Sequence, residues 1–268
     1  MSPSDAELKT SRVDFRPKER FSSRADAYAR YRPSYPQAVI DSQIRKFPAS
    51  SAVLSVADIG SGTGIFSRLL LEKGFKVYAV EPNAPMRERA EEMLSSYPDF
   101  HSVSGEAVHT TLADHSVDIV VAAQAFHWFA APGAIREFRR ILKDSGLVHL
   151  IWNDRRTGID KFHVEYESLL VRYCPSYEEV NHRNVTLQTI CDLFPGWQIS
   201  VEHFENDQRV DFDGLKGRLE SSSYCPTPDH PNYEPLMDQL REMFKKHSQA
   251  GGVTIRQDCV AYFVVLTR

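Results

Sequence analysis

The sequence has few cysteines and lacks both a long apolar run and an apolar leader. None of its four cysteines lies close enough to another to form a CxxC pair. This spacing excludes zinc fingers and disulfide scaffolds, so we expect free thiols in a reducing compartment. No run reaches the roughly 18 apolar residues that suggest a membrane helix, and residues 1–20 lack the apolar core of a signal peptide. We therefore expect a soluble, cytoplasmic protein without a membrane partner.

An excess of positive charge is also absent. Lys and Arg number 32 against 36 Asp and Glu, which gives a net charge of −4. Proteins that bind nucleic acids usually carry a basic face, so we expect no nucleic-acid partner. The ten histidines form no HxH, HxxxH or HExxH pattern, and no acidic pair suggests a magnesium site. We expect no bound metal.

Short apolar strands alternate with helices from residue 53 to residue 152. Helical spacing follows the first strand, and glycines end the helices at residues 74 and 146. This alternation predicts an α/β fold with a doubly wound, Rossmann-like sheet covered on both faces. The sheet is expected to be seven-stranded and mostly parallel, with the last strand antiparallel. The expected strands are 53–59, 76–80, 100–103, 117–122, 147–152, 197–204 and 260–266.

The rest of the chain is expected to complete one domain. Residues 1–20 are polar and non-periodic, which indicates a loose tail. Residues 21–268 form a single domain without internal repeats. Helical segments at about 21–47, 155–195 and 212–250 are expected to cap the carboxyl ends of the strands, where such sheets bind their ligands.

A glycine-rich loop marks the first strand–helix junction. Gly60, Gly62 and Gly64 give GxGxG, whereas the dinucleotide fingerprint is GxGxxG. Glu81 ends the second strand, where a carboxylate can accept both hydroxyls of a ribose. The pattern favours a nucleoside without a diphosphate and disfavours a nicotinamide dehydrogenase. A tight turn without a ligand is the alternative for the glycines.

At these residues the chain resembles the class I S-adenosylmethionine (SAM)-dependent methyltransferases. The resemblance is to the small-molecule, type 11 group that includes trans-aconitate-methyltransferase-like proteins, and it covers roughly residues 21–268. The matching stretches are 28–36, Asp58–Gly64, Glu81–Met86, Gly105–Ala107, Val117–Val120, Gln124–Trp128 and 217–224.

The resemblance implies a role for each matching residue toward SAM or its product S-adenosylhomocysteine (SAH). The Gly60–Gly64 backbone, Ser61 included, would face the methionine end, and Asp58 would lie near the ammonium. Glu81 would hold the ribose. The remaining expected contacts are Met86 beside the nucleoside, Glu106 and Ala107 at the adenine, Gln124 beside the methionine, and Tyr28 with Arg32 in the N-terminal segment, where the arginine can pair with the SAM carboxylate.

Structural roles are the alternatives for several of these residues. Glu81 and Glu106 can be solvated carboxylates, Gln124 a core amide, and Tyr28 and Arg32 ordinary packing in a helix.

His127 is the candidate general base, since histidine transfers protons near neutral pH. Its alternative is packing beside Trp128 and Phe129. The Gln124–His127 stretch differs from the Asn/Asp-Pro-Pro-Tyr/Phe stretch of many nitrogen methyltransferases, which disfavours a nucleobase or glutamine substrate. The aromatic residues Tyr166, Tyr173, Trp197 and Tyr224 either line an acceptor pocket or form the cap's own core.

The predicted function is transfer of a methyl group from SAM to a small molecule, at a carboxylate or hydroxyl oxygen. Arg155 and Arg156 follow the fifth strand, where they either receive an acidic substrate or remain exposed. The alternative functions are a non-catalytic SAM- or SAH-binding regulator and a methyltransferase for protein or RNA. A monomer or a homodimer is expected.

Overall fold

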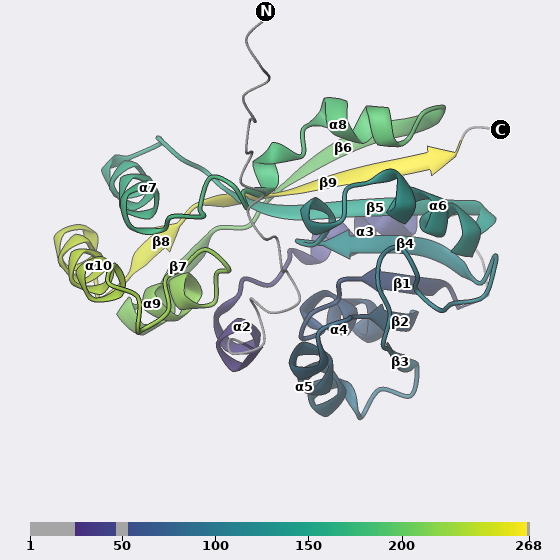
Figure 1. Cartoon of the computed structure of the whole chain (residues 1–268), viewed down its shortest axis with the longest axis horizontal. Helices are drawn as coiled ribbons and strands as arrows, with labels where there is room; N and C mark the ends of the chain where they lie inside the picture. The colour runs from purple at the N-terminus through teal and green to yellow at the C-terminus, as the bar shows by residue number, and fades with distance from the viewer. Residues whose placement is uncertain (1–24, 47–52, 267–268) are drawn as a thin grey trace, which may run out of the picture.

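A computed structural model describes residues 25–46 and 53–266, so the tail expected at 1–20 lies outside the described residues. Its main sheet has seven strands in the order β3-β2-β1-β4-β5-β9-β6 (Figure 1). Their bounds are Ser55–Ile59 (β1), Lys76–Val80 (β2), Phe100–Val103 (β3), Val117–Ala123 (β4), Leu142–Arg155 (β5), Trp197–Glu205 (β6) and Gln257–Leu266 (β9).

Strand directions confirm the predicted α/β class. β1 to β5 pair in parallel, and β9 lies antiparallel between β5 and β6. The chain moves from β1 outward to β2 and β3, then returns to β4 on the other side of β1. This reversal leaves a crevice at the carboxyl ends of β1 and β4, the usual place for a ligand in such sheets.

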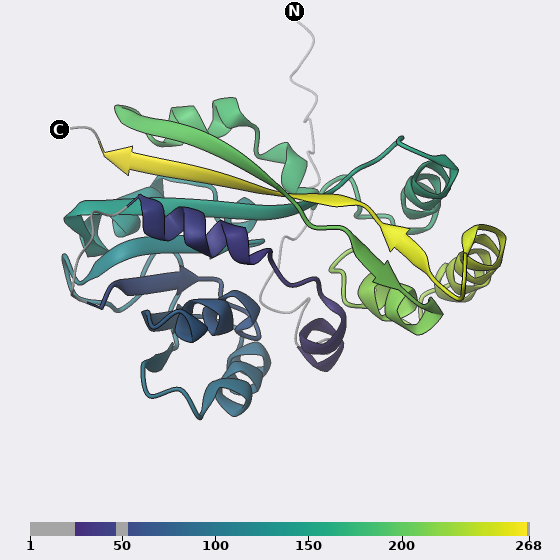
Figure 2. The ribbon, with the colours of Figure 1, turned by 180° about the vertical axis from the view of Figure 1, so that it is seen from behind.

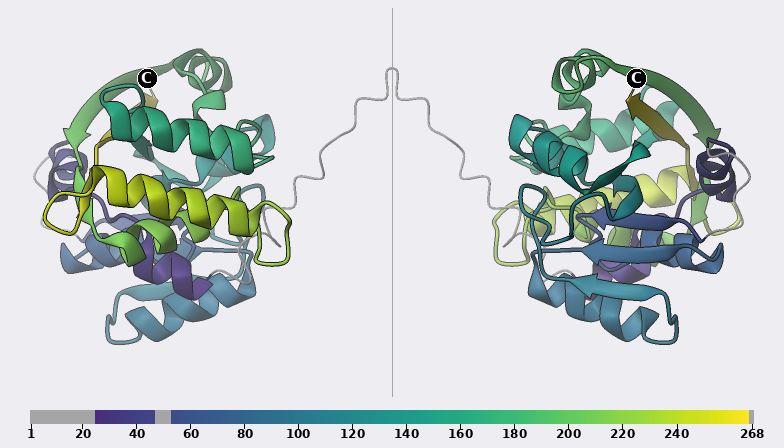
Figure 3. Two further views of the ribbon diagram at one scale, coloured as in Figure 1. Left: turned by 90° about the vertical axis from the view of Figure 1, so that its left-hand side faces the viewer. Right: turned by 90° about the vertical axis from the view of Figure 1, so that its right-hand side faces the viewer.

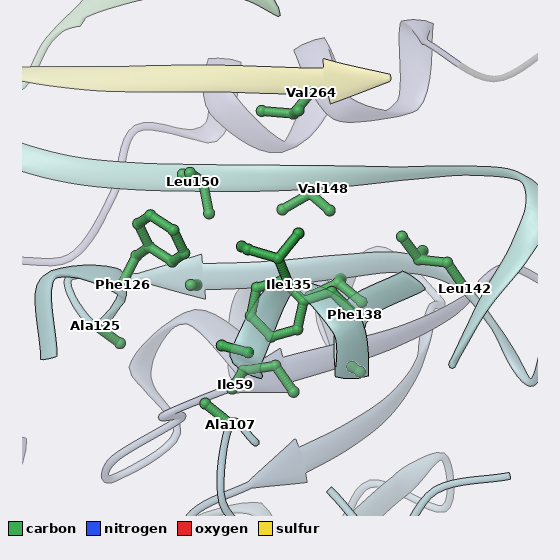
Figure 4. Close-up of a cluster of buried hydrophobic side chains, with 14 of the residues drawn as sticks. Ile59, Ala107, Ala125, Phe126, Ile135, Phe138, Leu142, Val148, Leu150 and Val264 are labelled. Carbon is green, nitrogen blue, oxygen red and sulfur yellow. The ribbon is translucent and has the colours of Figure 1, made fainter. Parts of the chain in front are cut away.

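Helices cover both faces of this sheet. On one face α6 (Pro132–Ile141) and α8 (Leu187–Leu193) enclose a core that includes Phe126 and Phe138 (Figure 4). Both rings are fully buried, and burial of a side chain this large contributes roughly 1.5–3 kcal/mol. The opposite face, seen in Figure 2, carries α3 (Gln37–Arg45), α4 (Ile65–Glu72) and α5 (Ala84–Leu94).

A third hydrophobic cluster forms the cap at one end of the sheet. It contains α7 (Lys161–Tyr173), α9 (Phe212–Glu220), α10 (Tyr233–His247) and a small sheet of β7 (Gln208–Val210) and β8 (Val253–Ile255). Figure 3 shows these helices stacked beside α2 (Ala25–Tyr31). α2 contacts both α9 and α5, so it bridges the cap and the sheet.

Parts of the expected cap segments pack on the sheet instead. Ile190 of α8 belongs to the core on one face, and Ile40 of α3 to the core on the other. The helix expected to run to Gly146 ends at Ile141, because Leu142 already pairs with Val117 in the sheet. β7 and β8 were not predicted, since three-residue strands give no measurable alternation.

Candidate active site

The glycine loop connects β1 to α4 and adopts a left-handed backbone. Gly60, Gly62 and Gly64 have φ values of 70°, 57° and 80°. A Cβ on Gly60 would lie 2.8 Å from the Cβ of Ala125, and one on Gly64 would lie 2.7 Å from a methyl group of Leu94. Neighbouring segments therefore require these two glycines. Gly62 differs: its nearest neighbours are the ends of flexible side chains at 3.4 Å or more, and it borders a cavity.

Glu81 links this loop to the next strand. Its carboxylate accepts hydrogen bonds from the N–H of Gly62 at 2.9 Å and from the N–H of Asn83 at 2.8 Å. Burial raises the pKa of Glu81, and the two backbone hydrogen bonds act in the opposite direction. Asn83 also caps α5 through Met86. Glu81 thus sets the spacing between the loops that follow β1 and β2.

Asp58 is a buried carboxyl group at the end of β1. One oxygen accepts a hydrogen bond from the Ser67 hydroxyl at 2.7 Å, while Oδ1 has no hydrogen-bond partner among the described residues. Burial raises the pKa of Asp58 to about 7; the Ser67 hydrogen bond opposes this rise and the charge of Glu81 adds to it. A buried, unpartnered oxygen of this kind fits a cationic ligand.

The site has two main cavities, and the first of them borders this loop. The glycine-loop cavity has a volume of about 240 Å³. Most of the expected cofactor residues line it, together with Trp128, Phe129 and neighbouring backbone: Tyr28, Gly60, Gly62, Glu81, Met86, Glu106, Ala107 and Gln124. The other three, Arg32, Asp58 and Ser61, line a smaller pocket shared with Tyr28, Gly60 and Gln124. The structure thus brings every one of these residues to one connected region.

The arginine cavity, about 120 Å³ in volume, lies between the sheet and the cap. Tyr28, Gln124 and Trp128 line both main cavities, so they mark the junction. Its other polar and aromatic walls include Arg32, His127, Arg155, Tyr166, Tyr177, His182, Arg183, Arg218 and Tyr224.

Gln124 holds an unusual conformation at the junction. It follows β4 with a φ of 56°, which is uncommon for a residue with a side chain. Its N–H donates to the Ile151 carbonyl at 2.8 Å and its Nε2 donates to the Asn153 carbonyl at 3.0 Å. Hydrogen bonds from the neighbouring strand thus maintain the strained backbone, a pattern common at functional sites.

His127 lies in a short 3₁₀ turn, Phe126–Trp128, beside the arginine cavity. Its Nδ1 accepts a hydrogen bond from the indole N–H of Trp152 at 3.3 Å. Burial, with the nearby charges of His182 and Arg32, lowers the pKa of His127 to about 3. An indole nitrogen can only donate, so the neutral ring carries its proton on Nε2. This arrangement makes His127 a hydrogen-bond donor and disfavours the expected role as general base.

Sequence patterns missed the residues that brace these loops. Glu137 of α6 accepts hydrogen bonds from the N–H and hydroxyl of Thr110, at 2.7 and 2.6 Å, and thereby holds the loop that carries Glu106 and Ala107. Hydrogen bonds from Arg140 and Thr110 lower the pKa of Glu137 to about 2. A glutamate within an amphipathic helix gives no sequence signal for such a role.

The expected cap aromatics divide into two groups. Tyr166 and Tyr224 line the arginine cavity. Tyr173 and Trp197 line none of the cavities described above: Tyr173 packs on the cap core, and Trp197, the first residue of β6, is buried against Phe194. The alternative interpretation, structural packing, holds for these two residues.

The expected arginine pair also divides. Arg155 lines the cavity and forms an ion pair with Glu167 at 2.6 Å, whereas Arg156 lies outside it and pairs with Asp258 at 2.6 Å.

Comparison with known proteins identifies the family of this chain. Residues 57–150, which include the glycine loop and Glu81, match a family model described as a methyltransferase domain. An uncharacterized methyltransferase from Mycobacterium tuberculosis is 39% identical over 229 residues, which cover 85% of this chain and 86% of that protein. The chain belongs to the class I S-adenosylmethionine-dependent methyltransferases.

Solved structures share the fold of this methyltransferase. A putative methyltransferase from an antibiotic biosynthesis pathway of Anabaena variabilis aligns with a TM-score of 0.60 at 22% identity, covering 84% of this chain and 97% of that one. A phosphoethanolamine N-methyltransferase from Haemonchus contortus, solved with SAH, aligns with a TM-score of 0.56 at 14% identity. That alignment covers 95% of this chain and 59% of the other.

The methyltransferase offers groups that fit SAM. The unpartnered Oδ1 of Asp58 suits an ammonium group, and Gly62 leaves the loop open to the cavity. The described residues contain no cluster of three or more His, Cys, Asp or Glu placed to hold a metal ion. None of the helices in residues 25–46 and 53–266 has the length and apolar character of a membrane span. All four cysteines are free thiols.

Proposed function

We propose that this methyltransferase transfers a methyl group from SAM to an oxygen atom of a small molecule in the arginine cavity. The observation that carries this proposal is the junction at Tyr28, Gln124 and Trp128, where the two main cavities share their walls. A donor in the glycine-loop cavity and an acceptor in the arginine cavity would meet there. Holding two reactants in line is the main requirement for a displacement at a methyl carbon.

The chain's own residues bind and orient the cofactor in this proposal. Glu81 accepts the ribose hydroxyls, with Met86 beside the nucleoside and the loop at Glu106 and Ala107 against the adenine. Asp58 pairs with the ammonium through its free oxygen, and Arg32 pairs with the carboxylate. The shared pocket of these last two residues supports the assignment, since both charges belong to the methionine end.

When bound, SAM supplies an electrophilic methyl group with a neutral leaving group. The acceptor atom must bring a lone pair. His127 accepts a hydrogen bond at Nδ1 from Trp152, so its neutral ring offers a donor at Nε2 and no free acceptor nitrogen. A carboxylate acceptor is ionised before it binds and needs no general base, so the lack of a free basic nitrogen on His127 supports a carboxylate over a hydroxyl.

The position of the arginine cavity favours a small molecule over a macromolecule. It lies between the sheet and the cap and is lined by residues of both. A protein or RNA substrate would need a surface-accessible path to the methyl group, and the net charge of −4 gives no attraction for RNA. A polar cavity beside the cofactor residues also argues against a regulator that only binds SAM.

Cofactor binding is the first test. Isothermal titration should give micromolar affinity for SAH in the wild type. Gly62→Arg, which fills the loop face, and Glu81→Ala, which removes the proposed ribose acceptor, should each lose at least tenfold in affinity. Glu88→Ala is the matched control, because Glu88 is exposed on α5 and lines no cavity described above.

Transfer itself is tested with labelled SAM and panels of small acids, phenols and amines. Oxygen methylation of an acid should give a base-labile methyl ester. Label in an amine product, or only in macromolecules of a cell extract, would contradict the proposed acceptor. If the wild type does not bind SAH, the proposed function is wrong.

A further inference from the structure

The arginine cavity contains more positive charge than its acidic residues neutralise. Arg155 is paired with Glu167 at 2.6 Å and Arg183 with Asp154 at 2.8 Å. These two arginines are thus part of the wall, with their charges balanced by carboxylates. Arg218 is different.

Arg218 contacts neutral partners. One guanidinium nitrogen donates to Oε1 of Gln208 at 2.7 Å, and the other donates to Oε1 of Gln257. Within residues 25–46 and 53–266, no carboxylate lies at ion-pair distance from this guanidinium. The two glutamines come from β7 of the cap and β9 of the main sheet, so both orient the guanidinium without neutralising it.

The surroundings of Arg218 make this charge costly. Burial lowers the pKa of Arg218 to about 10; the tyrosines Tyr166 and Tyr224 oppose this effect, and Arg32 and Arg155 add to it. At neutral pH the side chain still carries its charge. A desolvated cation without a counterion is unfavourable, and an anion that enters the cavity would supply the missing partner.

The cavity wall near Arg218 also offers neutral donors. The hydroxyls of Tyr166 and Tyr224 have no hydrogen-bond partner among the described residues, although both side chains line the cavity. Guanidinium with phenolic donors is a common way to bind a carboxylate, because arginine presents two parallel N–H groups.

We propose that Arg218 binds an anionic group of the methyl acceptor, so that this enzyme acts on small organic acids. This inference deepens the proposed function and rests on it, because the anion bound by Arg218 is a methyl acceptor only if the proposed transfer takes place. Arg32, which lines the pocket that also holds Asp58, then remains available for the cofactor.

The test uses anion binding to the full chain with SAH at saturation. Probes are the straight-chain dicarboxylates from malonate to adipate, plus benzoate, each compared with its neutral amide. Isothermal titration should find at least one carboxylate that binds at millimolar concentration or tighter and at least tenfold more tightly than its amide. The Arg218→Gln variant should lose this binding at least tenfold while its SAH affinity stays within twofold of the wild type.

Two further variants keep the test independent of folding. Gln257→Glu leaves Arg218 in place but gives it a carboxylate partner, so it should also abolish anion binding and should raise the Tm. Arg218→Lys retains the positive charge but lacks the two parallel N–H groups of the guanidinium, so it should bind the carboxylate with intermediate affinity. Arg156→Gln is the control, because that arginine lies outside the cavity and has its own carboxylate partner.

The outcomes separate the two proposals. If none of the carboxylates binds, if the amides bind equally well, or if Arg218→Gln binds as the wild type does, the role of Arg218 is overturned. If SAH itself does not bind, the proposed function fails, and the same anion titration without SAH still decides whether Arg218 binds carboxylates.

Discussion

Trp152 determines which nitrogen of His127 carries the proton. The indole N–H donates to Nδ1 at 3.3 Å, and the pKa of the ring is lowered to about 3 by burial and neighbouring positive charge. The imidazole therefore remains neutral with its proton on Nε2. That nitrogen is the only one left for a ligand in the arginine cavity, and it donates.

This relationship predicts that His127 does not titrate near neutral pH. Nitrogen-15 NMR of labelled histidine should show the Nε2–H tautomer for His127, unchanged between pH 5 and pH 9. The signal is assigned by its loss in His127→Gln, a variant that should keep kcat within about tenfold of the wild type. A fall of about 10²–10⁴, the range for a lost general base, would restore the catalytic role.

Asp58 predicts a pH dependence of cofactor binding. Its raised pKa of about 7 means that it is largely protonated at pH 6 and ionised at pH 8. A cationic group beside Oδ1 favours the ionised form, so the pKa of Asp58 falls on binding. SAH affinity should therefore weaken as the pH falls below about 7 and level off above it, as measured by titration calorimetry. Asp58→Asn should bind more weakly at pH 8 and lose this dependence.

The same group predicts an effect on stability. A carboxyl with a pKa raised above its unfolded value of 3.8 favours the folded state most at low pH, and this contribution is lost as the pH rises to about 7. Asp58→Asn should therefore raise the free energy of unfolding at pH 8 but not at pH 4. An equal change at both pH values would contradict the raised pKa.

The close packing of Gly217 against Tyr31 holds α2 in its place beside the two cavities. A Cβ on Gly217 would lie 2.3 Å from the ring of Tyr31, closer than any contact allows. Gly217→Ala should displace α2, which carries Tyr28, and weaken SAH binding about tenfold, a loss of about 1.4 kcal/mol. Lys216→Ala, on the same helix, should have no such effect. Adding Tyr31→Ala to Gly217→Ala makes room for the methyl group and should recover part of the affinity; no recovery would mean that the clash is relieved elsewhere.

The main sheet was predictable because buried parallel strands appear in the sequence as short apolar runs. The expected bounds 76–80 and 100–103 coincide with β2 and β3. The first cavity followed from the same pattern, since strand ends place Gly60, Glu81 and Gln124 at one edge. β5 is longer than expected at both ends: Leu142 pairs with Val117 ahead of a register shift, and the polar residues 153–155 pair with β9.

The second cavity was less predictable because its walls come from distant segments. Arg32, Arg155 and Arg218 look alike as isolated charges, and their different partners appear only after folding. Residue type did not separate Tyr166 from Tyr173 either, since both occupy α7 at helical spacing. Two narrower expectations stay predictions: the subgroup of trans-aconitate-methyltransferase-like proteins and a monomeric or homodimeric state.

The cap's small sheet is built from the same two chain segments that form the far edge of the main sheet. β6 passes into β7 and β8 passes into β9 within a few residues, and the Asn206 N–H donates to the Gln257 carbonyl at 2.9 Å between them. The cap's small sheet is thus a continuation of the main sheet, and a backbone hydrogen bond joins the two strands where one sheet passes into the other. Gln208 and Gln257, the two partners of Arg218, therefore lie on segments that backbone hydrogen bonds join to the main sheet. α2, which carries Tyr28 at the junction of the two cavities, lies outside these two sheets and contacts α9 and α5.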